Sequence, residues 1–356
     1  MLKIIFRILS LLIICATLAT AWLVIEYRHF IDTPLNIGAG GMTYEIRPGM
    51  GLKEVGKELS ERGVIKHWGY LAALGQWQGT AHQIKAGEYR FAAGITPQQL
   101  LDQIVAGQVL GHALTIIEGW TFRQLMTAVN RNSELTHTLA GLNDQQIMEQ
   151  IGWPGQHPEG RFFPDTYHIT KGLSDVVFLQ RAYLAMSQHL ETVWQARDSG
   201  LPLASPYEAL ILASIVEKET GLASERPAIA GVFTRRLQQG MRLQTDPTII
   251  YGLGTDYDGD IKRRDLVTDT PYNTYLRVGL PPTPIALPGA DAIHAALHPQ
   301  PGHTLFFVAR GDGGHEFSES FEAHNKAVLK YQKKGQTAGA KAKDKASKML
   351  PATPSK

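Results

Sequence analysis

Two glutamates placed two residues apart are the groups in this sequence best suited to acid–base chemistry. Glu217 and Glu219 lie at the end of residues 208–220, a helical segment that is apolar nearly all round and stops at Gly221. A helix without a polar face is normally buried. A carboxyl group at its end is desolvated and lies at the negative pole of the helix dipole, and both effects raise its pKa. The segment therefore favours the protonated form that a general acid requires.

Helical spacing does not choose between these two glutamates. Residues two apart cannot share a helix face. Glu219 continues the face that contains Ile215, whereas Glu217 continues the face that contains Ala213. On spacing alone, two solvated carboxylates in a frayed helix end are the simpler interpretation.

Six polar or aromatic residues downstream could bind a sugar by hydrogen bonding and stacking. They are Gln244, Thr245, Asp246, Tyr272, Asn273 and Tyr275. Asp246 could instead cap a turn before Pro247, and the tyrosines could be buried in a strand.

Other titratable residues give weaker signals. Glu159 and Asp165 lie in an aromatic segment, and we interpret them as structural or cleft-lining. The spacing of His315 and His324 matches no zinc motif and no nucleophile elbow is present, so we interpret them as structural histidines. Neither a metal nor an organic cofactor is expected.

The composition is that of a folded protein with an acidic body. The 356 residues include 44% hydrophobic ones, which excludes a disordered chain. The formal charge of +2 arises from the last segment, because the residues before position 333 hold 28 Lys+Arg and 32 Asp+Glu. An acidic body argues against a nucleic-acid partner. The single cysteine, Cys15, rules out an internal disulfide and a cysteine metal cluster.

The N-terminal residues 1–30 are expected to form a cytoplasmic N-terminus and a single transmembrane helix. Lys3 and Arg7 precede an uncharged run at residues 8–25, close to the roughly 20 residues that a spanning helix needs. The basic residues place the N-terminus in the cytoplasm. A cleaved signal peptide is the alternative, but the apolar run continues past the small-residue site at 19–21.

The rest of the sequence predicts an α+β protein with two domains. Residues 40–112 contain two strand–turn–helix units, the second with a helix start at Thr96, and such units resemble LysM modules that bind glycan chains. A compact spacer domain without a ligand is the alternative. Residues 113–332 form a larger α+β domain, and the Lys-rich tail 333–356 is expected to be disordered.

Several runs in the larger domain resemble the YceG-like, or MltG, endolytic murein transglycosylases. The matching runs are 213–220, 223–226, 232–237, 240–248, 251–252, 272–275, 279–282, 288–290, 306–309, 314–317 and 324–325. The 159–167 segment and the N-terminal elements fit as well, so the resemblance covers nearly the full chain.

The resemblance implies non-hydrolytic cleavage of the bond between N-acetylmuramic acid and N-acetylglucosamine within nascent glycan strands. The product has a 1,6-anhydromuramic end, and cleavage terminates strand elongation. The family's catalytic carboxylate corresponds to Glu219, and the family places the 244–246 stretch beside it. One carboxyl suffices because the muramic C6 hydroxyl replaces water, whereas most hydrolases need two.

The resemblance also implies partners and a location. The expected partners are peptidoglycan glycan strands, the membrane and, at the level of the family, peptidoglycan synthases. The chain is expected in the bacterial inner membrane with its catalytic domain in the periplasm. A hydrolytic muramidase and a non-catalytic scaffold of the wall synthesis machinery are the alternatives.

Overall fold

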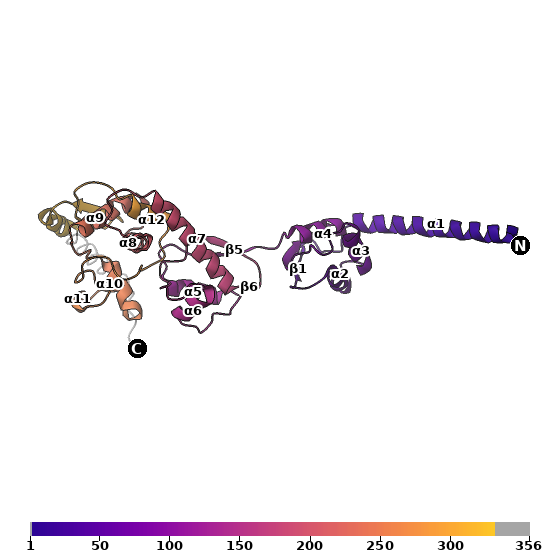
Figure 1. Ribbon diagram of the computed structural model, residues 1–356, viewed down its shortest axis with the longest axis horizontal. Coiled ribbons are helices and arrows are strands. Elements are labelled where there is room, and N and C mark those ends of the chain that lie inside the picture. Colours follow the sequence, from indigo (N-terminus) through magenta and orange to yellow (C-terminus); the bar gives the residue numbers. More distant parts are fainter. Residues whose placement is uncertain (1, 332–356) are drawn as a thin grey trace, which may run out of the picture. The chain divides into compact units, whose positions relative to one another are not determined.

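The computed structural model describes residues 2–331, with side chains from residue 6 onward. The expectation of a disordered tail at 333–356 therefore lies outside the described residues. The chain divides into two compact units (Figure 1). The first unit holds the residues up to Ala113 together with His168–Leu173, and the second holds Leu114–Tyr167 and the chain from Ser174 onward.

The chain begins with one long apolar helix, α1 (Leu2–Asp32). The segment Phe6–Asp32 is long and apolar enough to cross a membrane, and the side chains of its most apolar stretch are exposed. Exposed apolar side chains on this scale need an apolar environment. The helix has the dimensions expected from the sequence.

The last turns of α1 pack into the hydrophobic core of the first unit. Tyr27, Phe30 and Ile31 contact that core. The ring of Tyr27 lies edge-on to Trp77 with a centroid distance of 6.2 Å, and Phe30 lies 5.3 Å from Tyr70. The apolar helix thus continues without a break into the core of the first unit.

The first unit is built on a two-stranded antiparallel sheet and three helices. Strands β1 (Met42–Ile46) and β2 (Gly87–Phe91) pair with Met42 opposite Phe91. The helices are α2 (Leu52–Glu61), α3 (Trp68–Trp77) and α4 (Pro97–Ala106). Two strand–helix pairs, β1–α2 and β2–α4, correspond to the units expected from the sequence, whereas α3 was not expected.

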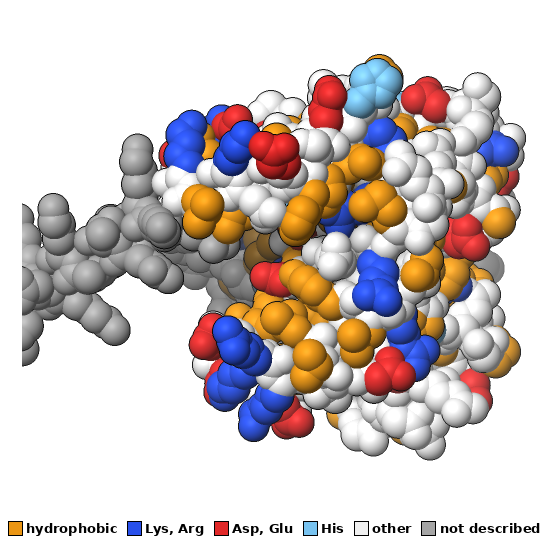
Figure 2. Space-filling model, turned by 90° about the vertical axis from the view of Figure 1, so that its left-hand side faces the viewer, with side chains coloured by type: hydrophobic (Ala, Val, Ile, Leu, Met, Phe, Trp, Pro, Cys, Tyr) orange, Lys and Arg blue, Asp and Glu red, His pale blue; other side chains and the backbone are white. Residues whose placement is uncertain are grey.

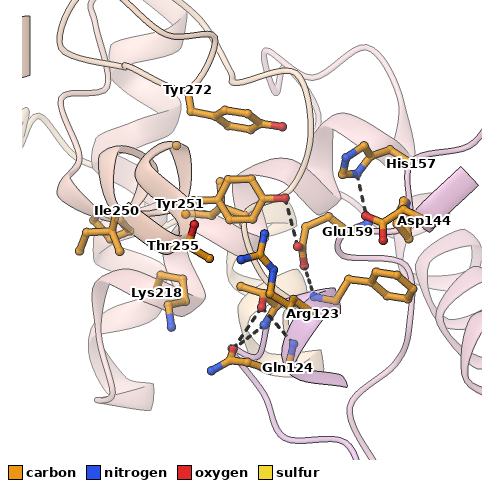
Figure 3. Close-up of a pocket in the computed structure, with 17 residues that line it drawn as sticks. Arg123, Gln124, Asp144, His157, Glu159, Lys218, Ile250, Tyr251, Thr255 and Tyr272 are labelled. Carbon is orange, nitrogen blue, oxygen red and sulfur yellow. Dashed lines mark hydrogen bonds between the residues drawn. The ribbon is translucent and has the colours of Figure 1, made fainter. Parts of the chain in front are cut away.

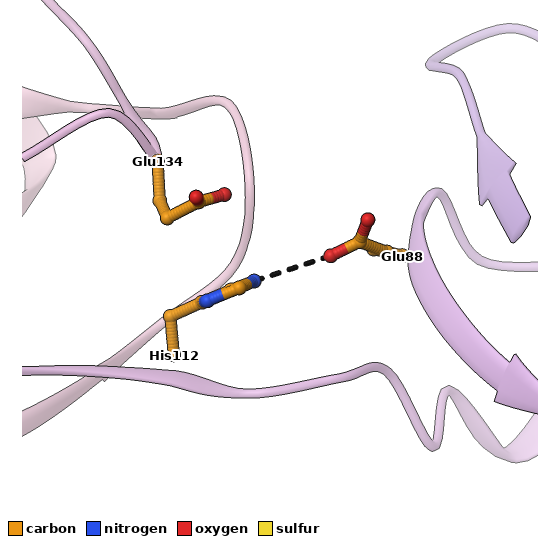
Figure 4. A group of neighbouring side chains, drawn as sticks. All are labelled: Glu88, His112 and Glu134. Carbon is orange, nitrogen blue, oxygen red and sulfur yellow. Dashed lines mark hydrogen bonds and ion pairs between the residues drawn. The ribbon is translucent and has the colours of Figure 1, made fainter. Parts of the chain in front are cut away.

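Local sequence determines where α4 begins and ends. The Thr96 side chain accepts a hydrogen bond from the Gln99 amide, and the Gln99 side-chain oxygen accepts one from the Thr96 amide. Gly107 ends the helix with φ 71°, a conformation that favours glycine. Beyond it, His112 Nε2 lies 3.2 Å from Glu88 Oε2 and attaches this segment to β2 (Figure 4).

The second unit is mainly helical, with short strands at its borders. Its elements, with those that border it, are β3 (His112–Thr115), α5 (Phe122–Arg131), β4 (Leu135–Thr136), α6 (Asp144–Ile151), β5 (Thr166–Ile169), β6 (Leu173–Ser174), α7 (Asp175–Gln195), α8 (Pro206–Glu219), η1 (Ala223–Glu225), α9 (Arg226–Gln238), α10 (Asp246–Leu253), η2 (Gly254–Asp256), α11 (Arg263–Val267), α12 (Ala290–Leu297), β7 (Phe306–Ala309) and β8 (His315–Ser318). Strands β7 and β8 form an antiparallel hairpin.

Helix α8 forms the centre of the second unit. It packs against α7, α9, α10 and α12, and all eight residues from Ala209 to Val216 are buried. The Ser205 side chain caps its start. Ser214, also buried, donates to the Ile211 carbonyl and accepts from the Ile285 amide at 3.0 Å. The burial predicted from the apolar sequence is confirmed, and the end of α8 is held rigidly.

Candidate active site

The last three side chains of α8, those of Glu217, Lys218 and Glu219, point in different directions. Glu217 accepts hydrogen bonds from Arg226 at 3.0 Å and from the Gly289 amide at 3.0 Å. Arg226 is itself buried. Lys218 donates to the Gly119 carbonyl at 3.1 Å. Glu217 is thus occupied in joining α8 to α9 and to the start of α12, which removes it from contact with a ligand.

Glu219, by contrast, points into a cavity and has one hydrogen-bond donor. The Thr245 hydroxyl donates to its Oε2 at 2.7 Å. Desolvation raises the pKa of Glu219 to about 7, and the negative charge of Asp246 acts in the same direction, whereas Thr245, His315 and Arg236 lower it. The raised pKa favours the protonated form of Glu219 that a general acid requires.

The cavity in front of Glu219 has a volume of about 490 Å³. Its polar wall comes from α8, α9 and the chain around α10, and its apolar wall comes from the β7–β8 hairpin and the residues after it. The lining residues are Glu219, Arg236, Leu243, Gln244, Asp246, Tyr275, Phe306, Phe307, Val308, Ala309, His315, Phe321, His324 and Val328. On the face of the second unit shown in Figure 2, hydrophobic side chains gather across the middle, with single charged groups between them. A polar wall opposite an aromatic wall suits a sugar, which has hydroxyl edges and apolar ring faces.

The backbone behind Glu219 is fixed by a cluster of buried threonines. Thr274 Oγ1 accepts from the Thr245 amide at 3.2 Å and lies 2.8 Å from Thr248 Oγ1. Gln244, with φ 51°, is the one non-glycine residue of positive φ in the described part of the chain, and its amide donates to the Thr274 carbonyl. Strained backbone of this kind persists only where its surroundings hold it. The cluster therefore fixes the hydroxyl that orients Glu219.

The structure separates the six residues that the sequence suggested for sugar binding. Gln244, Asp246 and Tyr275 line the cavity with Glu219, and the Tyr275 hydroxyl donates to Asp246 at 2.5 Å. Thr245 is buried behind the acid rather than lining the cavity.

Tyr272 and Asn273 lie away from this cavity. Tyr272 lies in a loop rather than a strand, and its hydroxyl is 2.9 Å from that of Thr283. Asn273 is completely buried, and its amide donates to the carbonyls of Asp265, Leu266 and Thr268. Its hydrogen-bonding groups are used to hold the loop that positions Tyr275.

Arg236 and His315 also line the cavity, a placement that the sequence did not indicate. Arg236, on α9, is buried and donates to the carbonyls of Leu305 and Leu243. His315 forms a 2.7 Å pair with Glu225, so it has the structural partner expected of it, yet it also faces the cavity. Both positions depend on the hairpin folding over α9, a contact between distant parts of the sequence.

Glu159 is a buried carboxyl group in a separate cavity of about 650 Å³ (Figure 3). It accepts from the Phe122 amide at 2.9 Å and from the Tyr251 hydroxyl at 3.1 Å. Burial raises its pKa to about 7. Asp165 is exposed and accepts from the Thr166 amide. Glu159 is thus cleft-lining in a cavity distinct from that of Glu219.

Comparison with known proteins places this arrangement in a family. The model of the YceG-like family matches residues 44–330, which include both cavities. The chain belongs to the YceG-like family.

Relatives of known name agree with this membership. An endolytic murein transglycosylase of Bacillus subtilis is 29% identical over 304 residues, which cover 80% of this chain and 83% of that protein. One of Streptococcus pneumoniae is 27% identical over 343 residues, 86% of this chain but 61% of the relative's length. The crystal structure of a YceG-like protein from Listeria monocytogenes is 27% identical, has a TM-score of 0.50 and covers 81% of this chain and 99% of its own.

Proposed function

We propose that this protein is an endolytic lytic transglycosylase of peptidoglycan and that Glu219 is its catalytic acid and base. One observation carries the proposal: the Glu219 carboxyl faces a cavity, and its pKa is raised to about 7. Glu217, the neighbouring carboxyl of α8, is bound to Arg226 and Gly289. The names of the relatives support the same activity.

The proposed reaction uses one carboxyl twice. Glu219 first donates its proton to the glycosidic oxygen between N-acetylmuramic acid and N-acetylglucosamine, and the bond from C1 to that oxygen breaks. The acetamido oxygen of the muramic residue stabilises the cationic C1. The Glu219 carboxylate then removes the proton of the C6 hydroxyl, whose oxygen attacks C1 and closes the 1,6-anhydro ring. No water is consumed, and Glu219 ends in its protonated form.

The hydrogen bond from Thr245 suits this cycle. Because Thr245 donates to Oε2, the transferable proton lies on Oε1, the oxygen that this bond leaves available to the substrate. Gln244, Asp246 and Tyr275 would hold the sugar rings through hydrogen bonds, and Phe306 would support an apolar ring face.

A hydrolytic muramidase is the second candidate, because Asp246 supplies another carboxyl group in the same cavity. A hydrolase needs a second carboxylate to act on water or on C1. The Tyr275 hydroxyl already occupies Oδ1 of Asp246, which favours the lytic route. A non-catalytic wall-binding scaffold would leave the raised pKa of Glu219 without a use.

We also propose that α1 anchors the protein in the inner membrane, with both units on the periplasmic side. The apolar segment Phe6–Asp32 and the basic residues Lys3 and Arg7 before it support this orientation. The paired strand–helix units support a LysM-like, glycan-binding role for the first unit, and peptidoglycan synthases are the proposed protein partners.

Mass spectrometry of uncrosslinked glycan strands tests the reaction. The full-length protein in detergent should release internal fragments with anhydromuramic ends, and Glu219→Gln should release none. Glu191→Gln, at an exposed carboxyl of α7, is the matched control and should act as the wild type does. Fragments heavier by one water would identify a hydrolase, and cleavage by Glu219→Gln would exclude Glu219 as the acid.

A further inference from the structure

The cavity around Glu159 has no part in the reaction described above, yet it is built as a binding site. Its volume is about 650 Å³. Glu159, Tyr251 and Tyr272 line it, with the Tyr251 hydroxyl directed at the Glu159 carboxyl (Figure 3). Phe122 adds a further aromatic ring to the lining. Two cationic side chains, Arg123 and Lys218, line it as well.

This cavity shares its walls with the Glu219 cavity. Lys218 lines one and Glu219 the other, although they are consecutive in α8. Asp246 and Pro247, the first residues of α10, are divided between the two cavities in the same way. The end of α8 and the start of α10 therefore lie between the two cavities, which border the same two segments.

The charges favour an anionic branch. Neither Arg123 nor Lys218 forms an ion pair with any residue between 6 and 331, and both are exposed. Desolvation keeps the pKa of His157 below its usual value, so this side chain is neutral at pH 7. The carboxyl groups of the cavity are Asp144, which is exposed, and Glu159, whose pKa is raised by burial to about 7. The cavity thus offers two cationic donors, Arg123 and Lys218, beside these two carboxyl groups.

We propose that the Glu159 cavity binds the peptide branch of the murein strand, with Arg123 and Lys218 holding a carboxylate of that peptide. The inference rests on the proposed function, in which a muramic residue lies against Glu219. The lactyl group of muramic acid carries a short peptide with free carboxylates, and it is attached to the sugar whose glycosidic bond is cleaved. The aromatic side chains contact the apolar parts of the peptide. Lys218 would then bind the substrate, between the structural Glu217 and the catalytic Glu219.

Kinetics on two substrates test this site. The full-length protein is assayed on uncrosslinked strands that carry their peptides and on the same strands after an amidase has removed them. The wild type should show the higher kcat/KM on peptide-bearing strands, and Arg123→Gln should reduce that preference about tenfold, the effect of losing one charge-assisted hydrogen bond. Arg131→Gln, at an exposed arginine at the other end of α5, is the control. Equal preference in Arg123→Gln and wild type would overturn the proposal.

A binding experiment separates failure of this site from failure of the proposed reaction. The free tripeptide L-Ala–γ-D-Glu–diaminopimelate is titrated into the Glu219→Gln protein and followed by NMR. We expect saturable binding that is weakened about tenfold by a further Arg123→Gln change and unaffected by Arg131→Gln. Because this readout does not need catalysis, it stands even if no strand is cleaved. Absence of binding, or binding equal in all three proteins, would refute the peptide site.

Discussion

Replacing Thr245 by valine tests the acid–base role of Glu219 through its pKa. The Thr245 hydroxyl donates to Glu219 Oε2 at 2.7 Å and stabilises the ionised carboxylate. Valine keeps the shape of threonine but has no donor. The pKa of Glu219 should therefore rise above its value of about 7 in Thr245→Val.

The size of the rise follows from the hydrogen bond that is lost. A hydrogen bond to a charged group contributes about 1.5–3 kcal/mol, of which only the part specific to the ionised form shifts the pKa. Each pKa unit corresponds to about 1.4 kcal/mol. We therefore expect a shift of about one unit. Asp246→Asn should act in the opposite direction, since the negative charge of Asp246 raises the pKa of Glu219.

The assay is the pH dependence of kcat/KM on uncrosslinked strands. The general acid must be protonated, so kcat/KM of the wild type should fall about tenfold per pH unit above pH 7. This alkaline limb should move to higher pH in Thr245→Val and to lower pH in Asp246→Asn, whatever happens to the maximum rate. Limbs that coincide in all three proteins would refute the assignment of Glu219 as the titrating acid.

Three further predictions concern stability and the membrane. Glu217→Gln removes the nearest carboxylate from buried Arg226, which keeps Asp291 at 3.4 Å and Glu118 at 3.6 Å, so the free energy of unfolding should fall by only about 1 kcal/mol, measured by chemical denaturation. Glu219→Gln should instead stabilise the protein by about 1–3 kcal/mol at pH 8. The pKa of Glu219 in the folded protein lies above its ordinary value of 4.5, so the wild type loses stability as the pH rises from 4.5 through 7, whereas Glu219→Gln does not. A variant less stable than the wild type at pH 8 would contradict this. Trp77 is 80% exposed and lies beside Tyr27, near the end of the apolar helix, so brominated lipids should quench its fluorescence in liposomes. The Trp77 emission is measured as the difference between the spectra of the wild type and Trp77→Phe. A difference spectrum that bromine does not change would contradict an interfacial position.

Patterns within single elements were predictable from the sequence. The apolar residues of α8 predicted a buried helix, because a helix without a polar side has no face to turn toward solvent. Thr96, Pro97 and Gln99 predicted the start of α4, since capping depends on residues only three apart. The uncharged N-terminal run predicted the long helix α1.

Features that depend on distant contacts were not predictable in this way. Helical spacing could not separate Glu217 from Glu219, because their different surroundings come from Arg226 and Thr245 on other elements. The presence of Arg236 in the cavity depends on the carbonyl of Leu305, 69 residues away. Helix α3 was missed because its apolar residues lie on more than one side, so they give no regular periodicity.

With α1 as the proposed membrane anchor, its continuity with the first unit would couple that unit to the bilayer. A helix of 31 residues is about 46 Å long, whereas the hydrocarbon layer is about 30 Å thick, so the excess length lies outside it. That excess carries Tyr27, Phe30 and Ile31, which are part of the core of the first unit. Spanning helices respond to a mismatch in length by tilting. With α1 as the anchor, a thicker or thinner membrane would change the tilt of α1, and the orientation of the first unit relative to the membrane would change with it.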